Sequence, residues 1–115
     1  MKVKRFEAIT IPVSNIQRSL RFYHEVFDMT IIENSNQPTV HFGHQKIIFE
    51  LSNTFKPMTL SFVVSDPMSA MENHLKNYFV TILNGPIDKS DVKNAQSITI
   101  SDPDNHTIEL ISYQK

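Results

Sequence analysis

The second half of the sequence repeats the pattern of the first half at a constant offset of 51 residues. The stretch ITIPVSNIQRSLRFYHEVFDMTII at 9–32 aligns without a gap to LSFVVSDPMSAMENHLKNYFVTIL at 60–83. A tandem repeat restricts the fold more than either copy alone, because each copy is one supersecondary unit. The sequence therefore predicts two similar modules, at about 4–52 and about 58–113, within a single domain spanning 1–115.

Each module reads as strand, helix and three further strands. Residues 7–13 alternate like a strand, and the apolar residues of 16–27 recur at helical spacing after a capping Ser14 or Asn15. Three short strand-like runs follow, namely MTIIE, TVHFG and KIIFELS. In the second copy, Pro67 is expected at the first helical position. We predict a linker at 52–58 and an additional polar loop at 85–96. The fold class is α+β, with two tandem βαβββ modules.

The composition excludes several classes of function. The formal net charge of −1 gives no electrostatic basis for binding nucleic acid or an anionic membrane. The sequence has no cysteine, which rules out disulfides and thiolate metal sites. No apolar run approaches the roughly 20 residues of a membrane span, and the first residues lack the pattern of a signal peptide. We expect a soluble protein of the cytoplasm.

The second half also ends in a strand-like run that carries a charge, Glu109, among apolar residues. Alternate residues of a strand face opposite sides of a sheet. Phe49, Leu51, Ile108 and Leu110 are therefore expected to face the helices, which leaves Glu109 and its counterpart Glu50 on the second face. The first strand of each module places small residues on that same face. The two modules are therefore expected to form a curled mixed sheet around a shared cleft that Glu50 and Glu109 line.

Two stretches resemble the vicinal oxygen chelate superfamily, which includes glyoxalase I, bleomycin-resistance proteins and extradiol dioxygenases. The first is similar to the pattern V-x-D-x-x-x-S-x-x-F-Y-x-x-x-L-G through Val13, Asn15, Ser19, Phe22, Tyr23 and Phe27. The second is similar to the hairpin D-P-D-G-N-x-I-E through Asp102, Pro103, Asp104, Ile108 and Glu109. Here Asn105 replaces the glycine, and asparagine is the residue that best tolerates a left-handed turn position after glycine. The resemblance covers essentially the whole chain.

The resemblance implies a divalent metal that acts as a Lewis acid on a chelating substrate. The corresponding ligand positions in this sequence are Ala8, Glu50, Thr59 and Glu109, and both expected histidines are absent. If any residues bind a metal, they are Glu50 and Glu109, which would hold Mg²⁺, Mn²⁺, Ni²⁺ or Zn²⁺ only weakly, since a tight zinc or nickel site usually includes histidine.

Two functions remain open from the sequence. One is a small-molecule binding protein with a degenerate metal site, for which the candidate ligand-binding residues are Ala8, His41, Glu50, Thr59, Ser61 and Glu109. The other is a metal-dependent lyase or dioxygenase of the glyoxalase type, in which Glu109 is a catalytic base or a metal ligand. The plainer alternative for Glu109 and Glu50 is an ion pair with a lysine or arginine, or a position at a solvated rim. The family also implies a homodimer.

Overall fold

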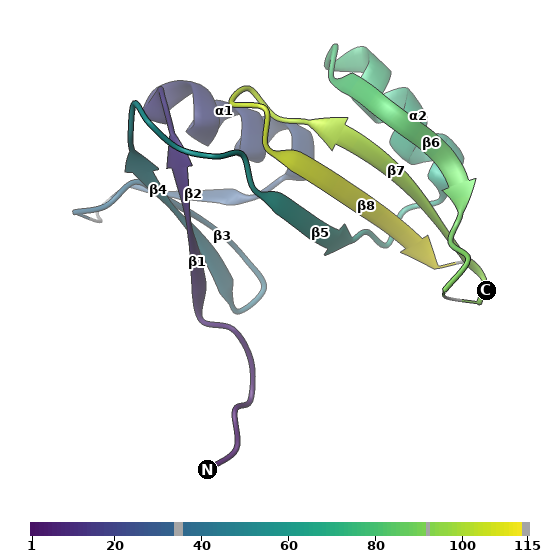
Figure 1. The fold of residues 1–115 in the computed structure, drawn as a ribbon, viewed down its shortest axis with the longest axis horizontal. Helices are drawn as coiled ribbons and strands as arrows, with labels where there is room; N and C mark the ends of the chain where they lie inside the picture. Colours follow the sequence, from purple (N-terminus) through teal and green to yellow (C-terminus); the bar gives the residue numbers. More distant parts are fainter. Residues whose placement is uncertain (34–35, 92, 114–115) are drawn as a thin grey trace. The chain divides into compact units, whose positions relative to one another are not determined.

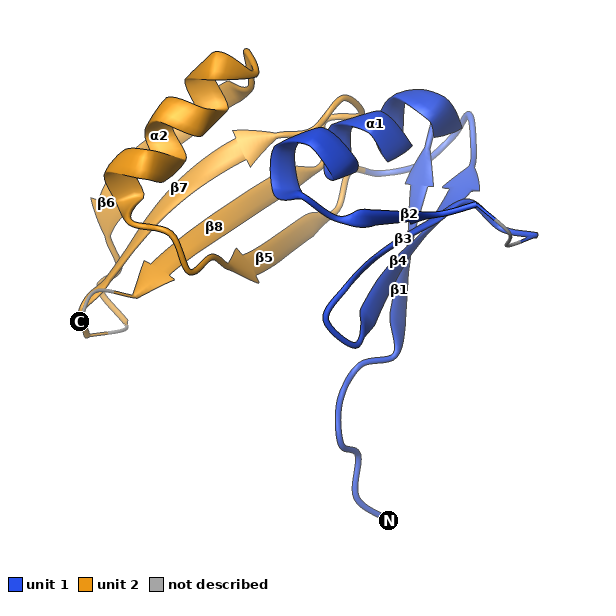
Figure 2. Ribbon diagram, turned by 180° about the vertical axis from the view of Figure 1, so that it is seen from behind, with its two compact units in different colours: residues 1–56 blue, residues 57–115 orange. Residues whose placement is uncertain are grey.

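The computed structural model describes residues 1–33, 36–91 and 93–113. The chain divides into two compact units, Met1–Lys56 and Pro57–Lys115 (Figure 2). The division between them falls within the stretch 52–58 that the sequence predicts as a linker. Each unit contains one helix and one four-stranded sheet.

The two units have the same topology (Figure 1). Unit 1 consists of β1 (Ala8–Val13), α1 (Ile16–Phe27), β2 (Thr30–Ile32), β3 (Thr39–Phe42) and β4 (Gln45–Leu51). Unit 2 consists of β5 (Thr59–Val63), α2 (Met68–Asn77), β6 (Thr81–Asp88), β7 (Ala95–Ser101) and β8 (Thr107–Tyr113). The strand orders are β1-β4-β3-β2 and β5-β8-β7-β6. In each sheet the first pair is parallel and the other pairs are antiparallel. The predicted α+β fold of two tandem βαβββ modules is confirmed.

Helix α1 forms where the sequence supplies signals for both of its ends. The side chain of Asn15 accepts a hydrogen bond from the backbone N–H of Arg18 at 3.0 Å, which satisfies one free donor of the first turn. Asp28 ends the helix in a left-handed conformation with φ of 58°. Tyr23 is fully buried on the inner side of the helix, and its ring centroid lies 5.3 Å from that of Phe49 on β4. Both predicted ends of this helix are confirmed.

In each unit the helix covers one face of the sheet and leaves the opposite face without a helix of that unit (Figure 2). We call this second face the open face. The apolar side chains that alternate toward the helix form the core. In unit 1 they include Ile11, Val13, Val40, Ile47 and Phe49, and in unit 2 Leu60, Ile98, Ile100, Ile108 and Leu110. The prediction that the two open faces share one cleft stays a prediction.

Three details differ from the sequence-based expectation. Leu51 was expected to face the helix in the core, but it is the last residue of β4, where the chain leaves the sheet, and it is 65% exposed. Pro67 occupies the cap rather than the first turn of α2, because its ψ of 150° is extended; its carbonyl accepts the first helical hydrogen bond, from Met71. Residues 85–88 continue β6 and residues 95–96 begin β7, instead of belonging to the predicted loop.

The hairpin between β7 and β8 forms as the sequence predicts, with Asn105 at φ of 66°. One carboxylate oxygen of Asp102 accepts hydrogen bonds from the backbone N–H groups of Asp104 and His106 at 2.9 and 2.8 Å. His106, which directly precedes β8, is fully buried. Its Nδ1 accepts a hydrogen bond from the N–H of Met58 at 2.9 Å, which holds the segment before β5 against the hairpin.

Neither helix in the described part of the chain is long and apolar enough to cross a membrane.

Replacing Asn15 by alanine removes the hydrogen-bond acceptor that caps α1. We expect Asn15→Ala to lower the free energy of unfolding by about 1 kcal/mol, measured by urea denaturation. The matched control is Asn53→Ala, at an exposed position in the linker, which should change it by less than about 0.5 kcal/mol. Equal losses in the two variants would contradict the capping role.

Candidate functional site

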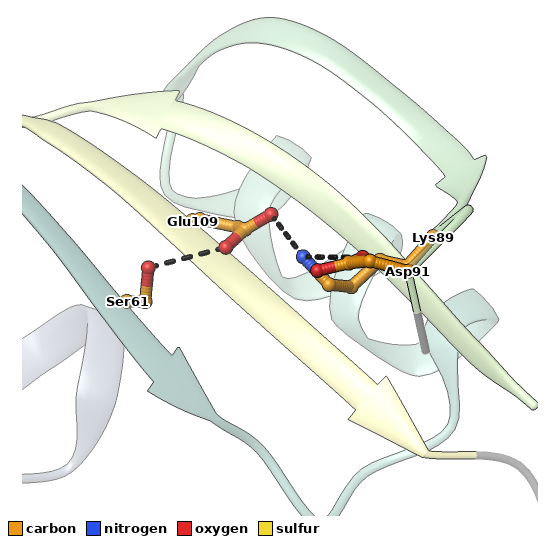
Figure 3. A network of polar contacts seen from close by, with 4 residues as sticks. All are labelled: Ser61, Lys89, Asp91 and Glu109. Carbon is orange, nitrogen blue, oxygen red and sulfur yellow. Dashed lines mark hydrogen bonds and ion pairs between the residues drawn. The ribbon is translucent and has the colours of Figure 1, made fainter. Parts of the chain in front are cut away.

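Glu109 lies on the open face of unit 2, flanked on both sides by hydroxyl-bearing strand neighbours. Its partner on β5 is Ser61 and its partner on β7 is Thr99. Directly paired residues of adjacent strands project from the same face, so these three side chains form one polar row across the sheet. The Ser61 hydroxyl donates a hydrogen bond to Glu109 Oε1 at 3.1 Å (Figure 3). The structure thus brings together two of the predicted site residues, Ser61 and Glu109.

The other carboxylate oxygen of Glu109 is held by a lysine. Lys89 Nζ donates to Glu109 Oε2 at 2.9 Å, and the ammonium lies 3.8 Å from Oδ1 of Asp91 (Figure 3). The Lys89 and Glu109 side chains are only 15% and 27% exposed, whereas that of Asp91 is 75% exposed. This short, partly desolvated contact is a charge-assisted hydrogen bond, which is stronger than a neutral one. The sequence had left an ion pair with a lysine open as the plainer alternative for Glu109, and the structure shows that ion pair.

Lys89 comes from the loop that joins β6 and β7. Its backbone N–H donates to the carbonyl of Ala95 at 2.9 Å, which places its backbone at the end of the hairpin. Glu109, in contrast, is paired with Thr99, four residues further along β7. The lysine side chain therefore runs back along the sheet to reach the carboxylate.

The pair fixes the charge of both groups at neutral pH. The hydrogen bond from Lys89 lowers the pKa of Glu109, and hydrogen bonds from the Ser61 and Ser97 hydroxyls lower it further. The hydrogen bond to Glu109 raises the pKa of Lys89. Glu109 is consequently a carboxylate with a weakened affinity for protons, which is unfavourable for a general base.

The remaining candidate of unit 2, Thr59, lies exposed on the open face beside this polar row. Its partner on β8 is Thr107, two residues before Glu109. Two residues along a strand correspond to about 6.6 Å. Thr59 is therefore a neighbour of the Glu109 row rather than its direct partner.

The candidates of unit 1 are spread along their sheet. Ala8 pairs with Lys46, whereas Glu50 pairs with Pro12, four residues further along β1. That separation corresponds to about 13 Å along the strands, so the structure does not bring Ala8 and Glu50 together. His41 is half-buried on the same open face, where Thr30 and Lys46 are its partners.

The residues present do not fit a divalent metal of the glyoxalase type. Ala8 has no donor atom, Thr59 offers only a neutral hydroxyl, and Lys89 already holds the Glu109 carboxylate. In residues 1–33, 36–91 and 93–113, no three His, Asp or Glu side chains lie close enough together to hold a metal ion. A metal at Glu109 would first have to displace the ammonium of Lys89, because two cations cannot share that oxygen without strong repulsion.

Lys89, Ser97 and Thr99 are residues of this site that sequence reasoning missed. Ser97, 2% exposed, lies diagonally from Glu109 on the open face, since its direct partner on β8 is Ile111. The only indication of Lys89 in the sequence was that residues 85–96 are an insertion in the second copy and contain two lysines. A lysine in an unpaired loop gives no indication of where its ammonium lies. Its partner could be assigned only once the length of β6 was known.

The fold is that of the vicinal oxygen chelate class. A sequence model of the Glyoxalase/Bleomycin resistance protein/Dioxygenase superfamily matches residues 5–80, and the chain belongs to this superfamily.

Relatives and solved structures agree with this assignment. A virulence protein of Salmonella typhimurium is 27% identical over 125 aligned residues, which cover 98% of this chain and 87% of that protein. An integron cassette protein from the mobile metagenome of V. cholerae has 26% identity and a TM-score of 0.86, with 99% of this chain and 98% of that chain covered. An antibiotic-binding protein from Streptomyces shares the fold, with a TM-score of 0.82, at 18% identity and with 99% of both chains covered.

Replacing Lys89 by methionine keeps an unbranched side chain, one atom shorter, and removes its charge. Lys89→Met is expected to raise the pKa of Glu109, because the Lys89 hydrogen bond is the largest cause of its lowering. The measurement is a pH titration of the Glu109 carboxyl carbon by NMR. Lys93→Met, from the same loop, should leave that pKa nearly unchanged; a Glu109 pKa that does not respond to Lys89→Met would contradict the ion pair.

The same pair gives unfolding a pH dependence of defined sign. Because the folded-state pKa of Glu109 is lowered, its stabilising contribution is complete above the ordinary glutamate pKa and is lost as pH falls through the lowered value. The stability advantage of the wild type over Glu109→Gln should therefore be present at neutral pH and shrink in acid, as measured by urea denaturation across pH. An advantage that grows in acid would contradict this sign.

Proposed function

We propose that this chain is a small-molecule binding protein whose ligand binds on the open face of unit 2, around Glu109, without a resident metal. The observation that carries the proposal is the ion pair of Lys89 and Glu109. It places a partly buried cation and anion together on a sheet face that the unit's own helix leaves uncovered. Partly buried charges cost free energy unless they are paired and hydrogen-bonded.

The side chains around this pair leave room for a ligand. Ser61 and Thr59 on β5 are both exposed, and the row next to Glu109 on β7 carries Thr99. Next to this face, the loop after β6 borders a polar hollow of about 450 Å³, lined by Asp88, Lys89, Ser90, Asp91, Lys93, Asn94, Ala95 and Gln96. Lys89 therefore takes part in both the ion pair and the wall of the hollow, which gives a ligand a route to it.

The alternative from the sequence is a lyase or dioxygenase that uses Glu109 as a base or a metal ligand. The donor set argues for binding over this chemistry. The lowered pKa makes Glu109 a poor base, and the ammonium competes with any metal for its oxygen. The antibiotic-binding protein of Streptomyces is a precedent for a protein of this fold that is described by what it binds.

Further parts of the proposal rest on the family and on the sequence pattern. We propose that the protein forms a homodimer and is located in the cytoplasm. We also propose that Ala8, His41 and Glu50 contribute to ligand binding through a cleft shared by the two open faces. Size-exclusion chromatography with light scattering tests the dimer, and a monomer at all concentrations would remove it.

Metal titration separates binding from the alternative. Calorimetric titration of metal-stripped protein with Mn²⁺, Ni²⁺ and Zn²⁺ is expected to show no stoichiometric site of micromolar affinity that depends on Glu109, because Lys89 holds its carboxylate. Glu109→Gln is the control that identifies the site, since exposed histidines also bind Zn²⁺ and Ni²⁺. Stoichiometric micromolar binding that disappears in Glu109→Gln would overturn the metal-free proposal.

A thermal-shift screen of small molecules tests the binding itself. A ligand that binds only the folded state, present at 100 times its Kd, adds about 2.7 kcal/mol of apparent stability. We expect a stabilising compound whose shift is lost in Glu109→Gln and kept in Glu25→Gln, an exposed position on α1. Stabilising compounds whose shifts are all indifferent to Glu109→Gln would place the site elsewhere.

A further inference from the structure

We propose that Lys89 is the group that recognises the ligand, and that the ligand is an amphipathic, uncharged molecule. Its oxygen acceptor, a ketone or amide carbonyl, accepts a hydrogen bond from the Lys89 ammonium, and its apolar body lies over the neighbouring row of side chains. This inference rests on the proposed binding function and adds the chemical class of the ligand.

The ammonium of Lys89 has donor capacity beyond its ion pair. A lysine ammonium carries three N–H donors and no acceptor, and Glu109 Oε2 takes one of them at 2.9 Å. Asp91 is 3.8 Å away, which is beyond hydrogen-bond distance. Because the side chain is 85% covered and anchored at Glu109, the ammonium is held in one place before a ligand arrives. Such preorganisation favours a directed hydrogen bond to an acceptor.

Glu109, in contrast, is already occupied as an acceptor. Its Oε1 accepts a hydrogen bond from Ser61 and its Oε2 accepts one from Lys89. The Lys89 ammonium, 2.9 Å from Oε2, would repel a cationic ligand that approached this carboxylate. Glu109 is therefore a poor site for a cation.

The local charges disfavour an anionic ligand as well. Around the ammonium stand two carboxylates, Glu109 and Asp91, against the one positive charge of Lys89. An incoming carboxylate or phosphate would face this net negative charge at short range, in a region that is partly shielded from water. An uncharged carbonyl oxygen avoids that repulsion and still accepts the hydrogen bond.

An apolar row lies next to the polar one on the same face. Val63 on β5 pairs with Ile111 on β8, Ile111 pairs with Ser97 on β7, and Ser97 pairs with Ile87 on β6. Ile111 and Ser97 are buried, whereas Val63 and Ile87 at the two ends of the row are 67% and 45% exposed. Tyr113, two residues beyond Ile111 on β8, is 51% exposed. The polar row of Ser61, Glu109 and Thr99 is one step away along the strands. A polar end and an apolar end thus adjoin within two rows, and this spacing suits a small amphipathic molecule.

The test uses three probes that share a benzene ring and differ in charge: acetophenone, benzoate and benzylammonium. Each is titrated into the full ¹⁵N-labelled chain, and the backbone amide signals of Ser61, Ser97, Thr99 and Glu109 are followed. We expect acetophenone to shift these signals at the lowest concentration. Lys89→Met should raise the Kd for acetophenone roughly tenfold, which is the loss of affinity expected for one hydrogen bond to a charged donor. The control is Lys76→Met, on α2 in the same unit.

The outcomes separate this inference from the function on which it rests. If benzoate or benzylammonium shifts the signals of this face as strongly as acetophenone, or if Lys89→Met keeps full acetophenone binding, the ligand class is wrong and the binding site stands. If none of the three probes shifts any signal on this face, both the binding site and the inference are overturned.

Discussion

The alternation of side chains along the strands is the constraint on which the rest of this structure depends. In each unit it commits one face of a four-stranded sheet to a single helix and releases the other face from the core. A one-residue slip in register would exchange the two faces. Glu109 could not sit between Ile108 and Leu110, both almost fully buried, unless it pointed away from them. The strand register thus places Glu109 on the open face.

The two copies have diverged at the corresponding carboxylate. Glu109 has a ladder partner on each side, Ser61 and Thr99, because β7 and β8 are both seven residues long. Glu50 is paired with Pro12 on one side only, since the four-residue β3 ends opposite Ile48. Unit 1 also lacks the longer hairpin that supplies Lys89. The same position in the repeat is therefore an exposed glutamate in one unit and an ion-paired one in the other.

Much of the fold was predictable because local signals and periodicity agreed. The bounds of α1 follow from Asn15 and Asp28, and the tandem pattern extended the assignment of four strands in the first half to four more in the second. Leu51 shows the limit, since periodicity assigns a face but does not say where the chain leaves the sheet. His106 shows another, because its burial depends on Met58, which is 48 residues away in the sequence.

The candidate site was predictable only in part, for the same reason. Register alone places Ser61 and Glu109 together, so their proximity could be expected from the sequence. The partner of Glu109 could not, because Lys89 reaches it only through the extension of β6 and the turn back to Ala95. Long side chains from loops are the contacts that strand periodicity does not encode. That lysine nevertheless carries the proposal of a metal-free binding site.

The most direct test of this account is an X-ray structure of crystals soaked in Mn²⁺, with anomalous diffraction recorded to locate the ion. The account predicts no anomalous peak at Glu109 and the Lys89 ammonium within hydrogen-bond distance of its carboxylate. A manganese ion bound to Glu109, with Lys89 turned away, would contradict it.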